Sequence, residues 1–221
     1  MEDWGERDPR WAGIRTEWLE VQGTRVRTLR HDGPATGIPQ LLVHGLGGSS
    51  TNWLEVMGEL SAYGPVLAMD LPGFGLTAPP VTNGSRVRPN ARFISALCEV
   101  VGWDRVVLYG NSMGGLISTL VAGHRQDLVS RLILVNPGLP APRRHAHRIP
   151  PMALLRFAPF VSQRLGTLAL ERMYDRLTPE RVYRETVNLV YADPDKLREP
   201  LREVAIENVA RATELDWRID G

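Results

Sequence analysis

The sequence predicts an α/β fold with a doubly wound, mostly parallel sheet. Four segments, at residues 39–45, 64–70, 104–110 and 129–137, each contain a short, continuously apolar run, which is the pattern of strands that are buried on both faces. Helical patterns separate these runs, and strands that alternate with helices at this spacing favour right-handed crossovers between parallel strands.

The predicted elements follow one another in a regular order. Residues 16–33 alternate on both sides of Gln22-Gly23, which predicts a two-stranded hairpin before the first apolar run. The strand at 39–45 leads to a helical segment over 52–62. The strand at 64–70 leads to a loop rich in proline and glycine and then to a helix over 91–101. After the strand at 104–110, a helix over 112–124 precedes the strand at 129–137.

After residue 138 the sequence has helical patterns only, at 151–173, 178–191 and 193–213. Thr178 and Asp193 are N-cap residues, each followed by proline at the first helical position, and they predict the starts of the second and third helices. The sequence thus predicts the N-terminal part of a sheet domain at 1–138 and a helical module at 139–213. Residues 214–221 are expected to start the return to the sheet domain.

Composition excludes several classes of function. The 26 basic and 25 acidic residues give a net charge of +1, so no broad field attracts nucleic acid or an anionic membrane. The most apolar late stretch, 150–170, is interrupted by Arg156 and Arg164 and falls short of a membrane span. We therefore expect a small-molecule substrate as the partner, and composition does not fix the oligomeric state.

Cys98 and the N-terminal sequence bear on the cellular compartment. A single cysteine excludes an internal disulfide and fits a reducing environment, and its helical surroundings favour a small core residue over a nucleophile. The first eleven residues are charged and have no apolar segment of the kind found in secretory signals. These features predict a cytoplasmic protein.

Three motifs directly follow predicted strands: "HGLGGSS" at 44–50, "DLPGFG" at 70–75 and "GNSMGG" at 110–115. In an open parallel sheet, the ligand crevice lies beyond the carboxyl ends of the strands. The residues of these motifs are therefore the candidates for chemistry.

Ser112 lies at the centre of the third motif, where a strand turns abruptly into a helix. The corner residue of such a turn has a strained backbone and leaves no room for side chains two positions away, which explains Gly110 and Gly114. Its hydroxyl would project into the crevice at a helix N-terminus, where the Met113 N–H points at any oxyanion that forms. This is the Gly-x-Ser-x-Gly pattern of a nucleophile elbow.

The first motif can supply a second oxyanion donor. Its glycines, beginning with Gly45, let backbone N–H groups approach a substrate oxygen, and the Leu46 N–H is the candidate. His44 is placed to brace this loop and is not favoured as a general base. Asp70 opens the second motif, and we interpret it as a structural hydrogen-bonding residue of that turn.

In this order and spacing, "HGLGG", "DLPGFG" and "GNSMGG" resemble the motifs of the α/β-hydrolase fold family. The likeness covers about residues 39–137, and the helical module that follows resembles the lid that many members insert after the sixth strand. The resemblance implies a triad in the chain order Ser, Asp or Glu, His, with Ser112 as the nucleophile and with no cofactor or metal. A serine at the elbow, unlike the aspartate of the dehalogenase and epoxide-hydrolase branches, implies an ester-like or other carbonyl substrate.

The other two triad members have no clear candidates in the sequence. In the family the acid follows the seventh or the sixth strand and the histidine follows the eighth, but the sixth strand here ends in Asn136-Pro137-Gly138. The histidines other than His44 lie in an early loop, at a helix end and in an arginine-rich loop (His31, His124, His145, His147). We therefore expect the acid and the histidine to lie beyond residue 221. These 221 residues alone are expected to be inactive and, with "RLILV" as an uncovered edge, poorly stable.

Three functions agree with these patterns. The main hypothesis is a serine-dependent hydrolase that acts on a carbonyl substrate through an acyl-enzyme at Ser112. Since "GNSMGG" is similar to the elbow of meta-cleavage-product hydrolases, a carbon–carbon bond hydrolase is the second. The third is a non-catalytic, ligand-binding relative that kept the crevice, although such a protein would not need a strained elbow and a matching oxyanion loop.

Overall fold

The computed structural model describes residues 3–79, 87–138, 178–190 and 193–214. The chain divides into two compact units, Met1–Leu139 and Pro140–Asp220. The helix expected at 151–173, both His145 and His147, and the expected return of the chain at 215–221 lie outside the described residues. The assignment of residues 139–213 as a lid stays a prediction.

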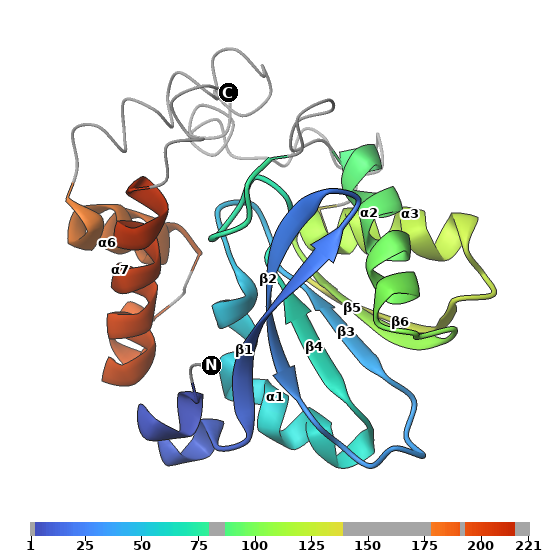
Figure 1. Cartoon of the computed structure of the whole chain (residues 1–221). Helices are drawn as coiled ribbons and strands as arrows, with labels where there is room; N and C mark the ends of the chain where they lie inside the picture. The colour runs from blue at the N-terminus through green and yellow to red at the C-terminus, as the bar shows by residue number, and fades with distance from the viewer. Residues whose placement is uncertain (1–2, 80–86, 139–177, 191–192, 215–221) are drawn as a thin grey trace. The chain divides into compact units, whose positions relative to one another are not determined.

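A six-stranded sheet forms the first unit, in the order β1-β2-β4-β3-β5-β6 (Figure 1). Its strands are β1 (Ile14–Val21), β2 (Thr24–His31), β3 (Gln40–Val43), β4 (Val66–Met69), β5 (Val106–Asn111) and β6 (Val129–Val135). β2 pairs antiparallel with β1 and β4, whereas β4, β3, β5 and β6 are parallel neighbours. The predicted doubly wound, mostly parallel sheet is confirmed.

The hairpin of β1 and β2 turns at the predicted residues. Gln22 and Gly23 have φ angles of 51° and 76°, which is the pair of positive values that a two-residue type I′ turn requires. The strand is longer than expected at its end, because His31, which was expected in a loop, is the last residue of β2.

The helices of the first unit are α1 (Leu54–Leu60), α2 (Val87–Val100) and α3 (Met113–His124). The segment predicted as one helix over 52–62 is split, since two 3₁₀ turns, η3 (Ser50–Trp53) and η4 (Ser61–Tyr63), flank α1. α2 begins four residues earlier than expected. Pro89 lies in its first turn, where the missing N–H would have no intrahelical acceptor, so the proline does not end the helix.

The core lies between the sheet and the helices α2 and α3, which contact each other and lie close together in Figure 1. Strand residues such as Leu41, Leu67 and Leu108 are at most 1% exposed and belong to one cluster with Ile94 and Ile117 of the two helices. Cys98 of α2 belongs to the same cluster, so the prediction of a buried core cysteine is confirmed.

β6 differs from the other parallel strands in its exposure. Every residue of β3 and β4 is buried, whereas Ile133, Leu134 and Val135 are 37%, 36% and 41% exposed. β6 pairs with β5 on one side, and no described strand pairs with its other edge. The expectation of poor stability stays a prediction.

Two short 3₁₀ helices that the sequence analysis did not predict precede the sheet, η1 (Trp4–Glu6) and η2 (Pro9–Trp11). Trp4 and Trp11 are 2% and 0% exposed, and their rings meet edge to face with centroids 6.1 Å apart. The N-terminal segment is therefore part of the packed unit.

The described part of the second unit contains α6 (Pro179–Val190), the 3₁₀ turn η6 (Pro194–Lys196) and α7 (Glu199–Thr213). α6 matches the predicted second helix. The prediction of one continuous helix over 193–213 is wrong, because Leu197 and Arg198 are extended and the helix starts again at Glu199, with Pro200 in its first turn. No described helix has the length and apolar character of a membrane span.

Candidate active site

Three loops follow β3, β4 and β5 and lie at one edge of the sheet. The register aligns Val43 of β3 with Met69 of β4 and with Gly110 of β5, so the three parallel strands end side by side. The motifs at 44–50, 70–75 and 110–115 therefore meet there, and we call these residues the loop cluster.

Ser112 forms the corner between β5 and α3. Its φ of 50° and ψ of −116° are a strained combination for a residue with a side chain. The Ser112 N–H donates to the Val135 carbonyl, and its own carbonyl accepts from the N–H groups of Gly115, Leu116 and Gly138. The backbone on both sides of the serine thus holds the strained geometry in place.

The glycines beside Ser112 are required by close packing of backbone. A Cβ on Gly114 would lie 2.4 Å from the carbonyl oxygens of Val43 and His44. A Cβ on Gly110 would lie 2.6 Å from the Gly114 carbonyl oxygen and 2.7 Å from Ser118 Oγ. Any larger residue at either position would push β5, α3 and the loop after β3 apart.

The loop after β3 passes directly beside the serine. A Cβ on Gly45 would lie 3.1 Å from Ser112 Cβ, and the Gly48 N–H donates to the Gly45 carbonyl at 3.1 Å to close a turn. Leu46 is 44% exposed at the tip, and Gly47 has the positive φ of 70° that the turn needs. Met113 is the first residue of α3, so its N–H has no intrahelical acceptor.

His44 is fully buried, and both of its ring nitrogens are occupied. Nδ1 lies 2.7 Å from the Gly45 carbonyl oxygen and Nε2 accepts the Leu71 N–H at 2.9 Å, so the ring is the neutral tautomer with its proton on Nδ1. Burial lowers the pKa of His44, although the nearby Asp70 carboxylate opposes this shift. This arrangement leaves the ring no nitrogen for the Ser112 proton.

Asp70 is also fully buried and faces away from solvent. Oδ1 accepts the Ser50 N–H at 2.6 Å, Oδ2 accepts the Leu76 N–H at 2.8 Å, and Oδ2 lies 3.7 Å from Nη1 of Arg27. Sequence reasoning missed Arg27, which is only 3% exposed. No local signal could have found it, because Arg25 and Arg27 alternate with Val26 as solvent-facing side chains of a strand do, whereas the structure buries every residue from Val26 to Leu29.

The comparison with known families decides the identity of the fold. A family model described as "Alpha/beta hydrolase family" matches residues 40–218, which is most of the chain. The chain belongs to the alpha/beta hydrolase family.

Curated relatives of this alpha/beta hydrolase carry several names. A 2-hydroxy-6-oxononadienedioate/2-hydroxy-6-oxononatrienedioate hydrolase of Burkholderia vietnamiensis is 27% identical over 85% of this chain and 61% of its own length. A 2-hydroxy-6-oxo-2,4-heptadienoate hydrolase of Pseudomonas putida is 38% identical over 50% of this chain and 41% of its own length. The dihydrolipoyllysine-residue acetyltransferase component of the acetoin cleaving system of Cupriavidus necator is 32% identical over 62% of this chain. The chain spans only 35% of the length of that third relative.

Solved structures support the fold alone. The epoxide hydrolase CorEH has a TM-score of 0.70 at 22% identity, with 94% of this chain and 74% of that chain covered. A haloalkane dehalogenase variant from Bradyrhizobium elkanii has a TM-score of 0.68 at 21% identity, with 91% of this chain and 66% of that chain covered. The alpha/beta hydrolase fold predicted from the three motifs is confirmed.

No described histidine of this alpha/beta hydrolase donates to or accepts from the Ser112 hydroxyl. His31 and His124 use Nδ1 for the carbonyls of Asp32 and Leu120. No cluster of three or more His, Cys, Asp or Glu side chains that could hold a metal occurs among the described residues.

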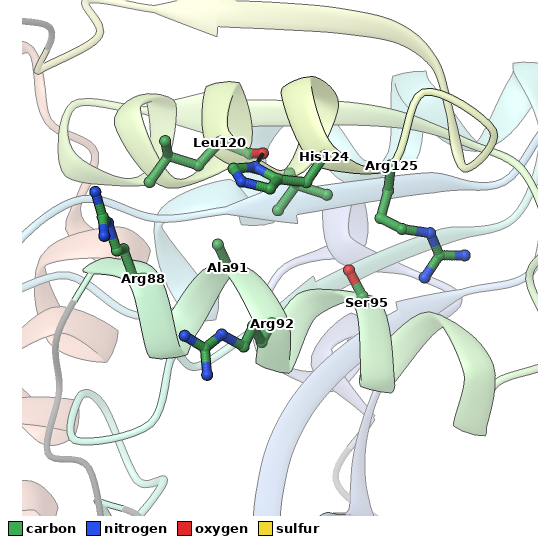
Figure 2. A pocket seen from close by; sticks show the side chains of 8 residues that line it. Arg88, Ala91, Arg92, Ser95, Leu120, His124 and Arg125 are labelled. Atoms are coloured by element: carbon green, nitrogen blue, oxygen red, sulfur yellow. Dashed lines mark hydrogen bonds between the residues drawn. The ribbon is translucent and has the colours of Figure 1, made fainter.

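A concave region, which we call the α2–α3 groove, lies between helices α2 and α3 (Figure 2). Its volume is about 500 Å³, and it is lined by apolar side chains at its base and by basic side chains and a serine around them (Ala91, Leu120, Val121, Arg88, Arg92, Ser95, His124, Arg125). Arg125 is paired with Asp127 at 2.9 Å, and both side chains are solvent-exposed. None of the residues of the loop cluster lines this groove.

Proposed function

We propose that the protein is a serine-dependent hydrolase, in which the Ser112 hydroxyl attacks a substrate carbonyl and forms an acyl-enzyme that water then hydrolyses. The strained Ser112 backbone, with φ of 50° between β5 and α3, is the observation that carries the proposal. Such strain persists only where the surroundings over-determine it, and it concentrates at active sites. A buried structural serine would gain nothing from this conformation.

The N–H groups of Leu46 and Met113 are the proposed oxyanion donors. Met113 N–H is unused by the helix, and the positive dipole end of α3 adds to its effect on a developing negative charge. Leu46 lies on the loop whose Gly45 packs against Ser112. Preorganised donors of this kind typically supply about 10²–10³ in rate each. His44, Gly45, Gly110 and Gly114 support this geometry and take no part in the bond changes.

The proposed reaction needs a general base from outside the described residues. As the bond between Ser112 Oγ and the carbonyl carbon forms, the hydroxyl proton passes to a histidine, which returns it to the leaving group when the acyl-enzyme forms. The two nitrogens of His44 are already committed, so His44 does not fill this role. An unassisted serine hydroxyl is a weak nucleophile, so the acyl transfer depends on this base. No cofactor enters this scheme.

A carbon–carbon bond hydrolase of the meta-cleavage-product type is the second candidate. Relatives named as hydrolases of 2-hydroxy-6-oxo-dienoate compounds match up to 85% of this chain at 27% identity and up to 38% identity over half of it. The elbow sequence Asn111-Ser112-Met113 also favours this substrate class. Ser112 and the two N–H donors would take the same roles with a ketone as with an ester.

The test is covalent labelling of Ser112 by a fluorophosphonate in the protein expressed from its own gene, with the labelled peptide identified by mass spectrometry. We expect Ser112→Ala to abolish labelling and to lower kcat by at least about 10³-fold without loss of folding. Ser95→Ala is the matched control, since Ser95 is also half-buried but lies on α2, and it should keep the wild-type rate.

The substrate class is read from two parallel assays, p-nitrophenyl esters of graded acyl length and a 2-hydroxy-6-oxo-dienoate substrate. Ser112-dependent turnover in the first supports the main proposal, and turnover confined to the second supports the carbon–carbon candidate. A folded protein that binds such a substrate, is not labelled and turns over neither compound is a ligand-binding relative, and the proposal is then wrong.

A further inference from the structure

The loop that carries Leu46 is held at both of its ends by the loop after β4. At its start, the Leu71 N–H donates to His44 Nε2 at 2.9 Å. At its end, the Ser50 N–H donates to Asp70 Oδ1 at 2.6 Å. Two consecutive residues, Asp70 and Leu71, thus fix the segment 44–50 against the end of β4.

Asp70 also forms hydrogen bonds within its own loop, after β4, and with β2. Its second oxygen accepts the Leu76 N–H at 2.8 Å, and the Asp70 N–H donates to the Arg27 carbonyl at 2.9 Å. A Cβ on Gly75, which has φ of 56°, would lie 2.2 Å from Asp70 Oδ2, so the turn closes tightly over the carboxylate. The two oxygens therefore connect two loops of the site to one rigid point on the sheet.

The positive charge that faces the Asp70 carboxylate is Arg27 of β2, and Trp4 of the N-terminal segment lies over it. Arg27 Nη1 lies 3.7 Å from Asp70 Oδ2, with the two side chains 3% and 0% exposed. The guanidinium lies 5.8 Å from the centre of the Trp4 ring, which is itself anchored by a 2.9 Å hydrogen bond from Nε1 to Thr16 Oγ1. An ion pair shielded from water in this way is much less screened than one at the surface.

We infer that Asp70 is a positioning residue of the active site, which sets the placement of the Leu46 N–H through its hydrogen bond to Ser50, and that Arg27 and Trp4 hold Asp70 in that orientation. The inference rests on the proposed function for its catalytic consequence only. The hydrogen bonds and the burial on which it stands are independent of that function. A segment more than a hundred residues before Ser112 in sequence, residues 3–11, then contributes to the rate at Ser112.

Asp70→Asn tests the inference, because an asparagine can accept one N–H group through Oδ1 but places an N–H₂ group where Oδ2 now accepts from Leu76 and faces Arg27. The matched control is Asp32→Asn, which removes an acid–arginine pair with Arg15 whose acid is 60% exposed. Asp70→Asn alone leaves the Arg27 charge buried without its partner, and this variant can fail to fold. The double variant Arg27→Met with Asp70→Asn removes both buried charges and provides a second test in that case.

Two measurements separate positioning from stability. Amide hydrogen exchange should become at least about tenfold faster at Ser50 or Leu76 in Asp70→Asn, and stay unchanged in Asp32→Asn. The rate of fluorophosphonate labelling and kcat, both measured at a temperature where the variant is fully folded, should fall about 10–100-fold with KM changed much less, as expected for a displaced oxyanion donor.

The outcomes distinguish this inference from the proposed function. If wild-type protein is not labelled at Ser112, the proposed function fails, and the exchange measurement alone decides whether Asp70 anchors the loop. Unchanged exchange at Ser50 and Leu76, or faster exchange with unchanged kcat per folded molecule, overturns the inference. Failure of both the single and the double variant to fold does so as well, because Asp70 would then be a stabilising core residue.

Discussion

The loop cluster and the α2–α3 groove both gather polar and ionisable side chains, but the loop cluster holds its His44 and Asp70 fully buried, whereas the arginines of the groove lie at the surface. In the loop cluster, His44 and Asp70 are fully buried, and each of their polar side-chain atoms has a named partner. In the groove, Arg88 and Arg92 are exposed and have no ion pair with any described acid. The groove is comparable in size to a ligand pocket, yet it lacks the fixed geometry that chemistry at a carbonyl requires.

The largest expected effect is the protection of Cys98 from alkylation, which tests the difference between the two faces of α2. Its outer face carries Arg92 and Ser95 into the groove, whereas Cys98 faces the core, where burial raises the pKa of the thiol from 9.0 to about 12. A shift of this size lowers the thiolate fraction near pH 8 about 10³-fold. Iodoacetamide should therefore alkylate native protein at least about 10³-fold more slowly than urea-unfolded protein. Rapid alkylation of the native protein would mean that α2 opens readily and that the two faces do not differ.

The next largest effect is expected at the elbow, where backbone from β3, β5 and α3 meets. Gly114→Ala places a Cβ 2.4 Å from two carbonyl oxygens, and we expect a loss of about 3 kcal/mol in the free energy of unfolding together with loss of labelling at Ser112. The measurement is chemical denaturation followed by tryptophan fluorescence.

Gly123→Ala is the matched control on the same helix. A Cβ at Gly123 meets nothing within 4 Å, so alanine should stabilise α3 by about 0.5–1 kcal/mol through its higher helix propensity. Equal effects at the two positions would contradict the close packing of the elbow.

The residues of the loop cluster differ in how far the sequence predicts them. The continuous apolar runs predict the strands, because a strand that is buried on both faces is apolar along its whole length. Gly110, Ser112 and Gly114 predict the sharp turn between β5 and α3, because only glycine fits on either side of the serine there. Local patterns cannot predict the contact between Arg27 and Asp70. It joins residues that are far apart in sequence, and it is covered by the ring of Trp4, a third residue distant from both, over the Arg27 guanidinium.

The N-terminal segment and α7 show the same limit. Trp4 and Trp11 are buried, their rings pack on each other, and their indole N–H groups donate to Thr16 of β1 and Glu55 of α1, although their charged neighbours suggest a solvated tail. In the second unit, Pro194 and Pro200 each fit the first turn of a helix. Periodicity alone does not reveal that the chain is extended at Leu197 and Arg198 between them.

A smaller effect is expected from the charge state of His44. Its pKa is lowered by burial, so in acid the unfolded chain binds a proton near pH 6.5 that the folded chain does not bind. The folded state should lose stability as pH falls below about 6.5, by at most about 1.4 kcal/mol per pH unit from this group. In His44→Gln this contribution disappears, and the free energy of unfolding measured from pH 7 to pH 5 should become less steep. The same slope in both proteins would show that His44 is not the neutral brace of the loop.

The smallest effect is expected in the α2–α3 groove. Arg88→Gln combined with Arg92→Gln removes two exposed charges that have no described acidic partner and leaves the apolar base of the groove intact. Changes of this kind usually alter the free energy of unfolding by less than about 0.5 kcal/mol.

Labelling of Ser112 provides the sharper comparison for the same double variant. α3 begins at Met113, next to the serine, and ends at His124 in the groove, so one helix connects the two regions. The Ser112 carbonyl accepts three backbone N–H groups, so we expect the loop cluster to be held by its own backbone contacts. The labelling rate of the double variant should then stay within about twofold of wild type. A tenfold change in labelling at unchanged stability would mean that groups in the groove act on Ser112 through α3. The groove would then belong to the active site.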